Sequence, residues 1–286
     1  MRTIKFKSLS SGSCGNCYFL GSFLQDGSCE SALLIDLGVS PRRLKKELEK
    51  EGIPISCIKG VLITHDHNDH IRAIGSYCKN LSLPVWMTGE LSGAFLVRHL
   101  GGEYLPSCRK ILSPGWNSID GGLIRARYFT VPHDATQTVG YAILIGEHKF
   151  VIMTDIGSFT EEASLWASQA DTVVIESNYD PQMLRKGPYP PELQERIRSG
   201  HGHLSNPECA AAIRQFSHPG LRQVFLCHLS EHNNDPALAV KCSREALDAG
   251  IRLTALPRQT PSILFELQSS QHERILEDTS GIPASL

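Results

Sequence analysis

Short apolar runs alternate along the chain with stretches in which apolar residues recur at helical spacing. The runs are rich in Val, Ile and Leu and are bounded by polar or turn-forming residues, which predicts strands. Strands are expected at residues 1–9, 31–36, 59–64, 83–87, 123–131, 140–145, 149–154, 172–176, 223–228 and 262–268. Helices are expected between many of them, at residues 40–52, 73–80, 89–99, 159–168, 206–216 and 237–249.

The helix expected at residues 40–52 carries clear boundary signals. Ser40 can cap its N-terminus, Pro41 suits its first turn, and Gly52 can end it. Strands and helices occur in both halves of the chain, and no linker rich in Pro, Gly and Ser separates them. We therefore expect one α/β domain with layered sheets over residues 1–268. Residues 269–286 are polar and weakly patterned and are expected to form a loose tail.

Composition narrows the class of protein. The chain has 286 residues, 41% of them hydrophobic and 20% charged, with a formal net charge of -2. Such a chain can bury a sizeable core, and its charge balance neither requires nor excludes nucleic acid. No apolar run is long enough to span a bilayer, and the first residues do not form a secretory signal. The nine cysteines are therefore expected to be reduced thiols in the cytoplasm, with no membrane partner.

The segment from Thr64 to His70 carries the candidate chemistry, because three histidines and two further acids fall within it directly after a predicted strand. Such a loop can turn His65 and His67 toward one point and Asp69 and His70 toward a neighbouring point. Imidazole and carboxylate groups suit zinc, iron or manganese. Isolated histidines are interpreted as ordinary polar residues: His99, His148, His218 and His272.

The run His-x-His-x-Asp-His after an apolar strand resembles the signature of the metallo-β-lactamase superfamily. The early aspartate of the family corresponds to Asp36, which ends a predicted strand before this run, and His133, Asp155 and His228 follow the run in order at or just after the ends of later predicted strands. The resemblance implies an α/β fold, an αββα sandwich of two mixed β-sheets flanked by helices, with the metal site at the sheet edge. It assigns the first metal to His65, His67 and His133. It assigns the second metal to Asp69, His70 and His228, with Asp155 as the bridge and Asp36 as a supporting residue.

Two cations in one site can share a water, lower its pKa and provide a bridging hydroxide near neutral pH. They can also neutralise the charge of a phosphodiester, although a thioester or a lactam would be hydrolysed by the same pair. The expected cofactors are two divalent metal ions, zinc foremost, with manganese or iron as alternatives. Asp69 and His203 are the candidate catalytic residues.

Three further segments bear on the substrate. The small residues from Leu9 to Cys17 either let the backbone approach a ligand or form a tight hairpin loop. The segment from Glu176 to Asp180 follows another strand. In the third segment, Asn206 is expected to cap a helix, which places His203 just before a helix N-terminus, a position that suits a phosphate and a proton donor.

These segments are similar to one branch of the superfamily, the WalJ/YycJ-type proteins, which resemble the ribonuclease Z and ribonuclease J group without its inserted domains. The similarity extends from about residue 5 to about residue 267 and rests on SGSxGN, LLIDLG, ITHDHNDH, VPHDA, TDIG, ESNYD, GHLSN and CHLS. It implies 5′-to-3′ exonuclease activity on DNA, with DNA favoured over RNA. The candidate substrate-binding residues are Ser11, Ser13, Asn16, Asn178, Arg196 and His203.

Two features leave alternatives open. Cys14 and Cys17 form a lone CxxC, which lacks the second pair of a structural zinc site and is interpreted as two thiols in a turn. Basic residues near the third segment could bind phosphates or form a solvated face: Arg185, Lys186, Arg196 and Arg198. A hydrolase of thioesters, lactones or small phosphodiesters remains the alternative function, and a non-catalytic metal-binding protein is the third. The sequence leaves the oligomeric state open.

Overall fold

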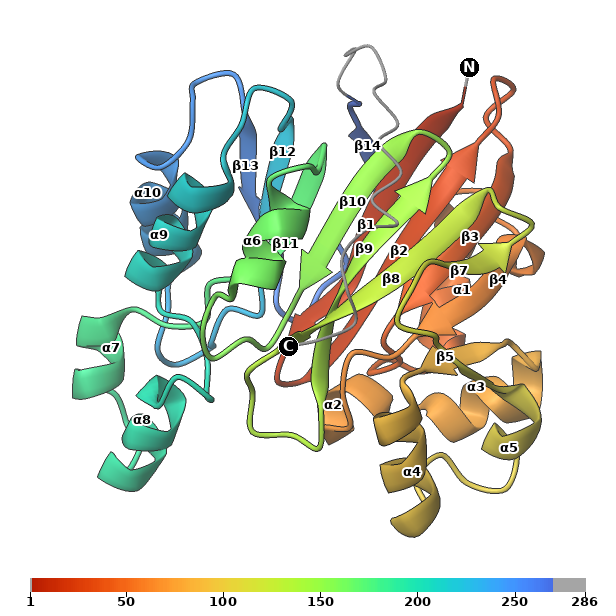
Figure 1. Ribbon diagram of the computed structural model, residues 1–286, viewed down its shortest axis with the longest axis horizontal. Helices are drawn as coiled ribbons and strands as arrows, with labels where there is room; N and C mark the ends of the chain where they lie inside the picture. The colour runs from red at the N-terminus through yellow and green to blue at the C-terminus, as the bar shows by residue number, and fades with distance from the viewer. Residues whose placement is uncertain (1, 270–286) are drawn as a thin grey trace.

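The computed structural model describes residues 2–269, which form two seven-stranded β-sheets packed face to face, with helices on the outer side of each (Figure 1). Each sheet combines antiparallel and parallel neighbours. The predicted αββα sandwich of two mixed sheets is therefore confirmed. The expectation of a single domain over residues 1–268 stays a prediction, and residues 270–286 of the expected tail lie outside the described residues.

The first sheet has the strand order β14-β1-β2-β3-β4-β5-β6. Strands β14, β1, β2 and β3 are antiparallel neighbours, whereas β3, β4, β5 and β6 run parallel. The strands span Thr3–Gly12 (β1), Gly15–Phe23 (β2), Cys29–Ile35 (β3), Ile58–Leu62 (β4), Val85–Met87 (β5), Arg109–Ile111 (β6) and Phe265–Leu267 (β14).

The second sheet repeats this arrangement in the order β13-β12-β11-β10-β9-β8-β7. Strands β7 to β10 are antiparallel neighbours, and β10 to β13 run parallel. The strands span Asn117–Asp120 (β7), Ile124–Val131 (β8), Thr138–Ile145 (β9), His148–Met153 (β10), Thr172–Glu176 (β11), Gln223–Cys227 (β12) and Arg252–Ala255 (β13).

Helices cover the outer face of each sheet. The apolar residues of the first sheet's outer face pack against α1 (Pro41–Lys50), α3 (Ile74–Leu81), α4 (Gly89–Val97) and α5 (Leu105–Cys108). Those of the second sheet pack against α6 (Glu161–Ala167), α9 (Asn206–Phe216) and α10 (Pro236–Arg244). Short helices η1 (Ile55–Cys57) and α2 (Asn68–Ile71) lie in loops, and α7 (Pro181–Lys186) and α8 (Pro191–Arg198) project at one end of the sandwich (Figure 1).

A third apolar cluster fills the space between the two sheets. Phe6 of the first sheet meets Phe150 and Phe225 of the second at ring-centroid distances of 5.3 and 5.0 Å. Because the central strands are buried on both faces, their sequences are nearly continuous apolar runs rather than alternating ones. This burial explains why the apolar pattern identified most of these strands.

Several elements differ from the expectation. Residues 15–23 form β2, a strand that was not expected, although the tight hairpin loop that was one interpretation of the SGSxGN segment is confirmed: β1 and β2 pair down to Gly12 and Gly15, with Ser13 and Cys14 as the turn. The last predicted helix ends at Arg244 instead of residue 249. The predictions also omitted β6, β7, β13, α2, α5, α7 and α8. Most of these elements are too short to show a clear apolar period.

The topology brings the carboxyl ends of the parallel strands β3, β4, β10, β11 and β12 to one edge of the sandwich. Glu176 at the end of β11 pairs with Cys227 of β12, and Met153 of β10 pairs with Ile175, so these strands end at the same level. Ligands of open α/β sheets bind at such an edge. No helix within residues 2–269 is long and apolar enough to cross a membrane.

Candidate metal centre

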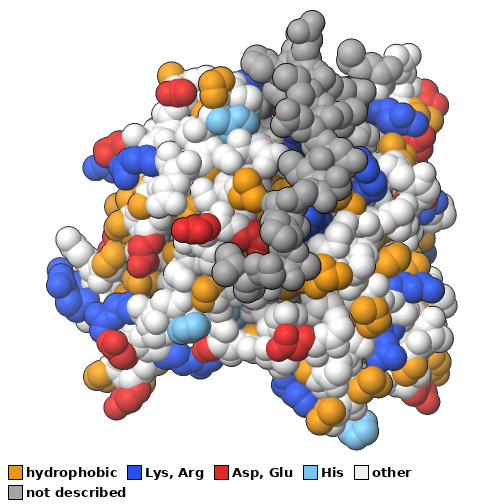
Figure 2. Space-filling view, in the orientation of Figure 1, with side chains coloured by type: hydrophobic (Ala, Val, Ile, Leu, Met, Phe, Trp, Pro, Cys, Tyr) orange, Lys and Arg blue, Asp and Glu red, His pale blue; other side chains and the backbone are white. Residues whose placement is uncertain are grey.

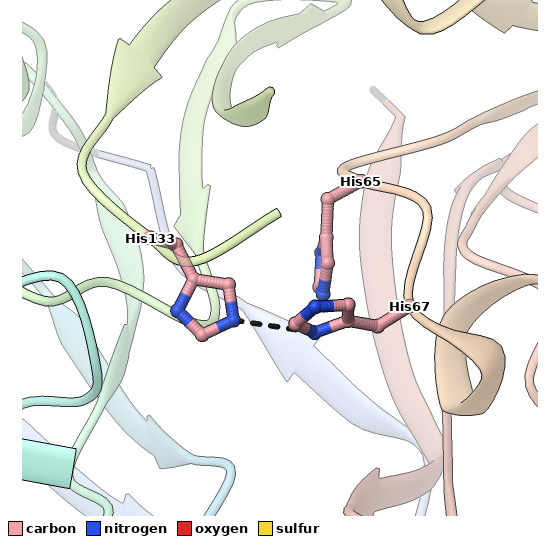
Figure 3. A group of neighbouring side chains, drawn as sticks. All are labelled: His65, His67 and His133. Atoms are coloured by element: carbon pink, nitrogen blue, oxygen red, sulfur yellow. Dashed lines mark hydrogen bonds between the residues drawn. The ribbon is translucent and has the colours of Figure 1, made fainter. Parts of the chain in front are cut away.

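Three histidine rings converge at the edge of the sandwich (Figure 3). His65 and His67 lie in the loop after β4, and His133 lies directly beyond the end of β8. Nε2 of His133 lies 3.4 Å from Nδ1 of His67, and the ring centroids of His65 and His67 are 4.7 Å apart. The grouping matches the set expected for the first metal.

Hydrogen bonds fix which nitrogen of these rings carries the proton. Nδ1 of His133 lies 2.7 Å from the Gly202 carbonyl oxygen, so it must donate, and Nε2 keeps its lone pair. Thr64 Oγ1 donates to Asp36 and can therefore accept from Nδ1 of His65, at 3.0 Å. The Nε2 atoms of His65 and His133 are thus left as electron-pair donors, as a metal ligand must be.

The second group consists of Asp69, His70 and His228. His70 Nδ1 lies 2.7 Å from Asp36 Oδ2 and donates to it, which leaves the lone pair on Nε2. His70 Nε2 lies 3.2 Å from Asp155 Oδ2 and 3.5 Å from Asp69 Oδ2. His228 Nε2 lies 3.8 Å from Asp69 Oδ2. One potential ligand atom from each of these three residues therefore lies within 4.8 Å of the other two.

Asp155 lies between the two groups. It follows β10, is buried, and approaches both the first group, with Oδ1 3.8 Å from His133 Nε2, and the second, with Oδ2 3.2 Å from His70 Nε2. Within residues 2–269, Asp155 Oδ2, His65 Nε2 and His228 Nε2 are buried atoms without a hydrogen-bond partner. Burying such atoms unpaired is costly, and divalent cations would satisfy all three. The residues present therefore fit a metal centre.

The Asn16 side chain adds to this fit. Its Nδ2 lies 2.8 Å from His70 Nε2 and 3.0 Å from Asp69 Oδ2, so one amide points its hydrogens at two acceptors. An amide N–H carries partial positive charge and satisfies acceptors as a cation would. Asn16 thus supports the position of Asp69 and His70 from β2.

The carboxylates near His70 favour positive charge at this position. Against the effect of burial, Asp155 and Asp36 raise the pKa of His70 to about 10.

Asp36 supports the ligand loop through hydrogen bonds to Thr64 and His70. It follows β3 with a backbone φ of 60°, and its buried carboxylate accepts from the Thr64 backbone N–H and Oγ1, each at 2.8 Å, and from His70. A positive φ is strained for a residue with a side chain, and the three hydrogen bonds compensate for that strain. The contacts are those of the supporting role expected for Asp36.

Glu176, which is not among the site residues expected from the sequence, lies at the centre of a second hydrogen-bond network. Its Oε1 accepts from Nδ1 of His203 at 2.7 Å and from Nδ1 of His228 at 2.9 Å, and its Oε2 accepts from the N–H groups of Ile156 and Leu204. Burial would raise the pKa of Glu176, but His203 and then His228 lower it. Its lone pairs are already used, so Glu176 is better placed to orient the two rings than to bind a metal. Its position at the end of a predicted strand, like that of the candidate ligands, was the feature of the sequence that could have identified it.

A pocket of about 240 Å³ opens beside this centre. Among its lining residues are four of the candidate substrate-binding residues, namely Ser13, Asn178, Arg196 and His203. Ser11 and Asn16 are fully buried instead: Ser11 Oγ accepts from the His228 backbone N–H at 3.0 Å. The geometry gives Ser11 and Asn16 supporting contacts beneath the ligands, and direct contact with a substrate stays a prediction for all six.

The cap expected before α9 is wrong by one residue. Ser205 is the N-cap: its Oγ accepts from the Glu208 backbone N–H, and Glu208 bonds back to Ser205. Asn206 instead lies in the first turn, buried, with its Oδ1 accepting from Ser177 Oγ and Asn234 Nδ2. The position of His203 just before this helix is unaffected, although its Nδ1 bonds to Glu176.

Lys and Arg side chains gather at the end of the molecule formed by α7 and α8 (Figure 2). Arg185 and Lys186 end α7, and Arg196 and Arg198 end α8. On α1, Arg43 Nη2 instead donates to the Leu9 carbonyl at 2.8 Å, and Lys45 pairs with Glu49, which favours a structural face there.

The remaining cysteines and histidines fit their ordinary interpretations. Cys14 is exposed at the hairpin turn and Cys17 is buried, where burial raises the pKa of its thiol. No metal-ligand group within residues 2–269 includes either of them. His148 is buried and bonds to Thr172, and His218 bonds to the Ala170 carbonyl. His272 lies outside the described residues.

Comparison with known proteins agrees with this geometry. Residues 32–229 match the β-lactamase superfamily domain. The chain is 31% identical over 236 residues to the exodeoxyribonuclease YycJ of Bacillus anthracis, covering 82% of this chain and 86% of that protein. It is 30% identical over 235 residues to the exodeoxyribonuclease WalJ of Streptococcus pneumoniae, covering 82% and 85%. The metallo-β-lactamase fold protein YhfI of Bacillus subtilis is similar with a TM-score of 0.68 at 18% identity, covering 93% of this chain and 100% of that chain.

Proposed function

Because this chain belongs to the metallo-β-lactamase superfamily and is a metal-dependent hydrolase, we propose that it is a dinuclear exonuclease that cleaves DNA from the 5′ end. Two relatives that it matches over 82% of its length are named exodeoxyribonucleases, which supports DNA as the substrate. Zinc is the proposed metal, with manganese and iron as alternatives, since the donors are imidazole and carboxylate groups.

The observation that carries the proposal is the convergence of electron-pair donors at two neighbouring points, three of them buried atoms without a hydrogen-bond partner within residues 2–269. His65, His67 and His133 would hold one cation, and Asp69, His70 and His228 the other, with Asp155 between them. Two bound divalent cations supply Lewis acidity toward a phosphodiester and lower the pKa of a water. The protein's contribution is to keep four of the five rings, those of His65, His70, His133 and His228, in the correct tautomer through Thr64, Asp36, Gly202 and Glu176 respectively.

Two residues are proposed to move protons in the reaction. The Asp69 side chain is 22% exposed beside the pocket, so its carboxylate can accept a proton from the attacking water. His203 lines the same pocket, and Glu176 holds its Nδ1 at 2.7 Å, which leaves Nε2 for the substrate. Against burial, Glu176 raises the pKa of His203, so a protonated ring is available to donate to the leaving oxygen.

The test uses DNA labelled at either end, single- and double-stranded, with protein loaded with zinc or manganese. Release of the 5′ label before the 3′ label is expected, and RNA of the same sequence should be cut more slowly. His67→Ala should be inactive, and His218→Ala, which belongs to none of the metal-ligand groups and bonds to the Ala170 carbonyl, should match the wild type. If no nucleic acid with any end type is cut, or if His67→Ala and the wild type behave alike, the proposal is wrong.

A hydrolase of small phosphodiesters, thioesters or lactones is the second candidate, and the limited pocket of about 240 Å³ favours it. The same residues would serve such a reaction, because the metal centre does not distinguish the substrate. Turnover of bis(p-nitrophenyl) phosphate or of a small thioester, without binding of oligonucleotides, would favour this function over the nuclease.

A further inference from the structure

An ion pair joins helix α8 to the metal centre across the mouth of the pocket. Arg196 of α8 donates through Nε to Oδ2 of Asp134, the residue that follows the ligand His133. The other carboxylate oxygen of Asp134 lies 3.4 Å from His133 Nε2 and 3.9 Å from His67 Nε2. Both members of the pair line the pocket. Asp134 therefore connects a surface helix directly to the ligands of the first metal.

The contact leaves most of the guanidinium available. Only Nε of Arg196 bonds to Asp134 within the described part of the chain, and the Arg196 side chain is 61% exposed. The two Nη atoms can therefore present a planar fork of N–H donors toward the pocket. Such a fork matches the paired oxygens of a phosphate, which a lysine cannot reproduce.

Local charge explains why the pair would be needed. A lone carboxylate at the mouth of the pocket would repel a phosphodiester that approaches the metals. Arg196 neutralises the charge of Asp134 through the ion pair and lines the same pocket. The neighbouring Arg198 differs, because it pairs at 2.9 Å with Glu195 on its own helix. Arg196 is thus the basic residue of α8 whose side chain reaches another element.

Helix α8 does not depend on this ion pair to stay in place. Its Ile197 and Leu193 pack against Tyr179, Leu184 and Tyr189. Removal of an exposed arginine side chain should therefore leave the helix folded, so that an effect on substrate binding can be separated from loss of structure.

We propose that Asp134 is a positioning residue that orients the Arg196 guanidinium to bind a backbone phosphate next to the cleaved bond of a nucleic acid. The proposal rests on the proposed nuclease function and adds a phosphate subsite to it. Asp134 acts through Arg196, so its removal should not weaken binding further once Arg196 is absent.

The test compares Arg196→Ala, Arg196→Lys, Asp134→Asn and the double variant Arg196→Ala/Asp134→Asn in the metal-loaded full chain. Loss of a charge-assisted hydrogen bond should raise KM for an oligonucleotide about tenfold with kcat nearly unchanged. Lysine at position 196 should restore only part of that loss, since it carries the charge without the fork. Arg198→Ala, on the same helix, is the matched control and should change KM less than about twofold.

The double variant decides whether Asp134 acts through Arg196. Its KM should be no higher than that of Arg196→Ala, because removing the carboxylate also removes its repulsion of the phosphodiester, whereas multiplied losses would overturn the positioning role. Metal content of each variant, measured by emission spectroscopy, must stay at the wild-type value. Loss of metal from Asp134→Asn would likewise overturn it, because Asp134 would then be supporting the ligands. A substrate with one uncharged methylphosphonate at the flanking position should abolish the difference between wild type and Arg196→Ala.

A binding measurement separates this proposal from the nuclease function. Fluorescence anisotropy with a phosphorothioate oligonucleotide reports binding whether or not the strand is cut, and Arg196→Ala should bind about tenfold more weakly, with a salt dependence reduced by about one unit. If the wild type binds but does not cut, the nuclease proposal fails and the subsite stands. Equal binding by wild type and Arg196→Ala, or no binding by either, overturns the subsite.

Discussion

Replacing Glu176 with Gln probes the network that holds both His203 and His228. The carboxylate accepts four hydrogen bonds, two from ring nitrogens and two from the backbone N–H groups of Ile156 and Leu204. An amide offers one oxygen and one NH₂ group, so two of these four donors must face another donor or lose their partner. The side chain is completely buried, and water cannot replace the lost bonds.

The cost follows from these contacts. Each hydrogen bond to a charged group contributes roughly 1.5 kcal/mol or more, so losing two should lower the free energy of unfolding by about 3 kcal/mol. For a chain of this length that corresponds to a melting temperature lower by roughly 5 °C. If the amide NH₂ faces His228, the ring must move its proton to Nε2, which removes the lone pair that binds metal. Affinity for the second metal should then fall by about 10- to 100-fold.

Scanning calorimetry of the metal-free and metal-loaded protein, together with competition against a chromophoric chelator, measures both effects. Glu208→Gln is the matched control, since this exposed residue belongs to the capping box of α9 and an amide can still accept from Ser205. A melting temperature and metal affinity of Glu176→Gln equal to those of the control would refute the reasoning. A normal metal affinity with a lower melting temperature would show that Glu176 does not orient His228.

Three further outcomes are expected. His203→Ala should reduce kcat at least about 100-fold while metal content by emission spectroscopy stays unchanged, and loss of metal would show that His203 is a ligand or a support. The wild type should hold about two metals per chain, lose activity with a chelator and recover it with added zinc. Asp155→Ala should hold fewer than one metal per chain, and two metals in this variant would rule out the bridging role of Asp155. Burial, only partly offset by Asp171, lowers the pKa of His148 to about 4, so its neutral form is stabilised in the folded state. This contribution of about 3 kcal/mol to the free energy of unfolding is present above pH 6.5 and lost as the pH falls toward 4. His148→Gln should therefore flatten the dependence of the free energy of unfolding on pH between these values, measured by denaturant titration, and an unchanged dependence would contradict the prediction.

The sequence by itself determined most strands and helices of the fold and the place of the candidate ligands among them, because both depend on local patterns. Strands buried on both faces must be continuously apolar, so β4, β10, β11 and β12 could be recognised within one or two residues of their ends. Four candidate ligands lie within six residues after β4, and a short segment can be interpreted without knowing what surrounds it.

The tertiary structure alone decided the partners of these residues, since hydrogen bonds between distant strands leave no periodic signal. Glu176 is 52 residues from His228, and Arg196 is 62 residues from Asp134. The start of β2 at Gly15 and Asn16 has little strand propensity and forms a strand because β1 pairs with it through Ser11 and Gly12. Such contacts depend on the order of the strands in the two sheets, which brings the carboxyl ends of the parallel strands to one edge. They could therefore be identified only from the tertiary structure.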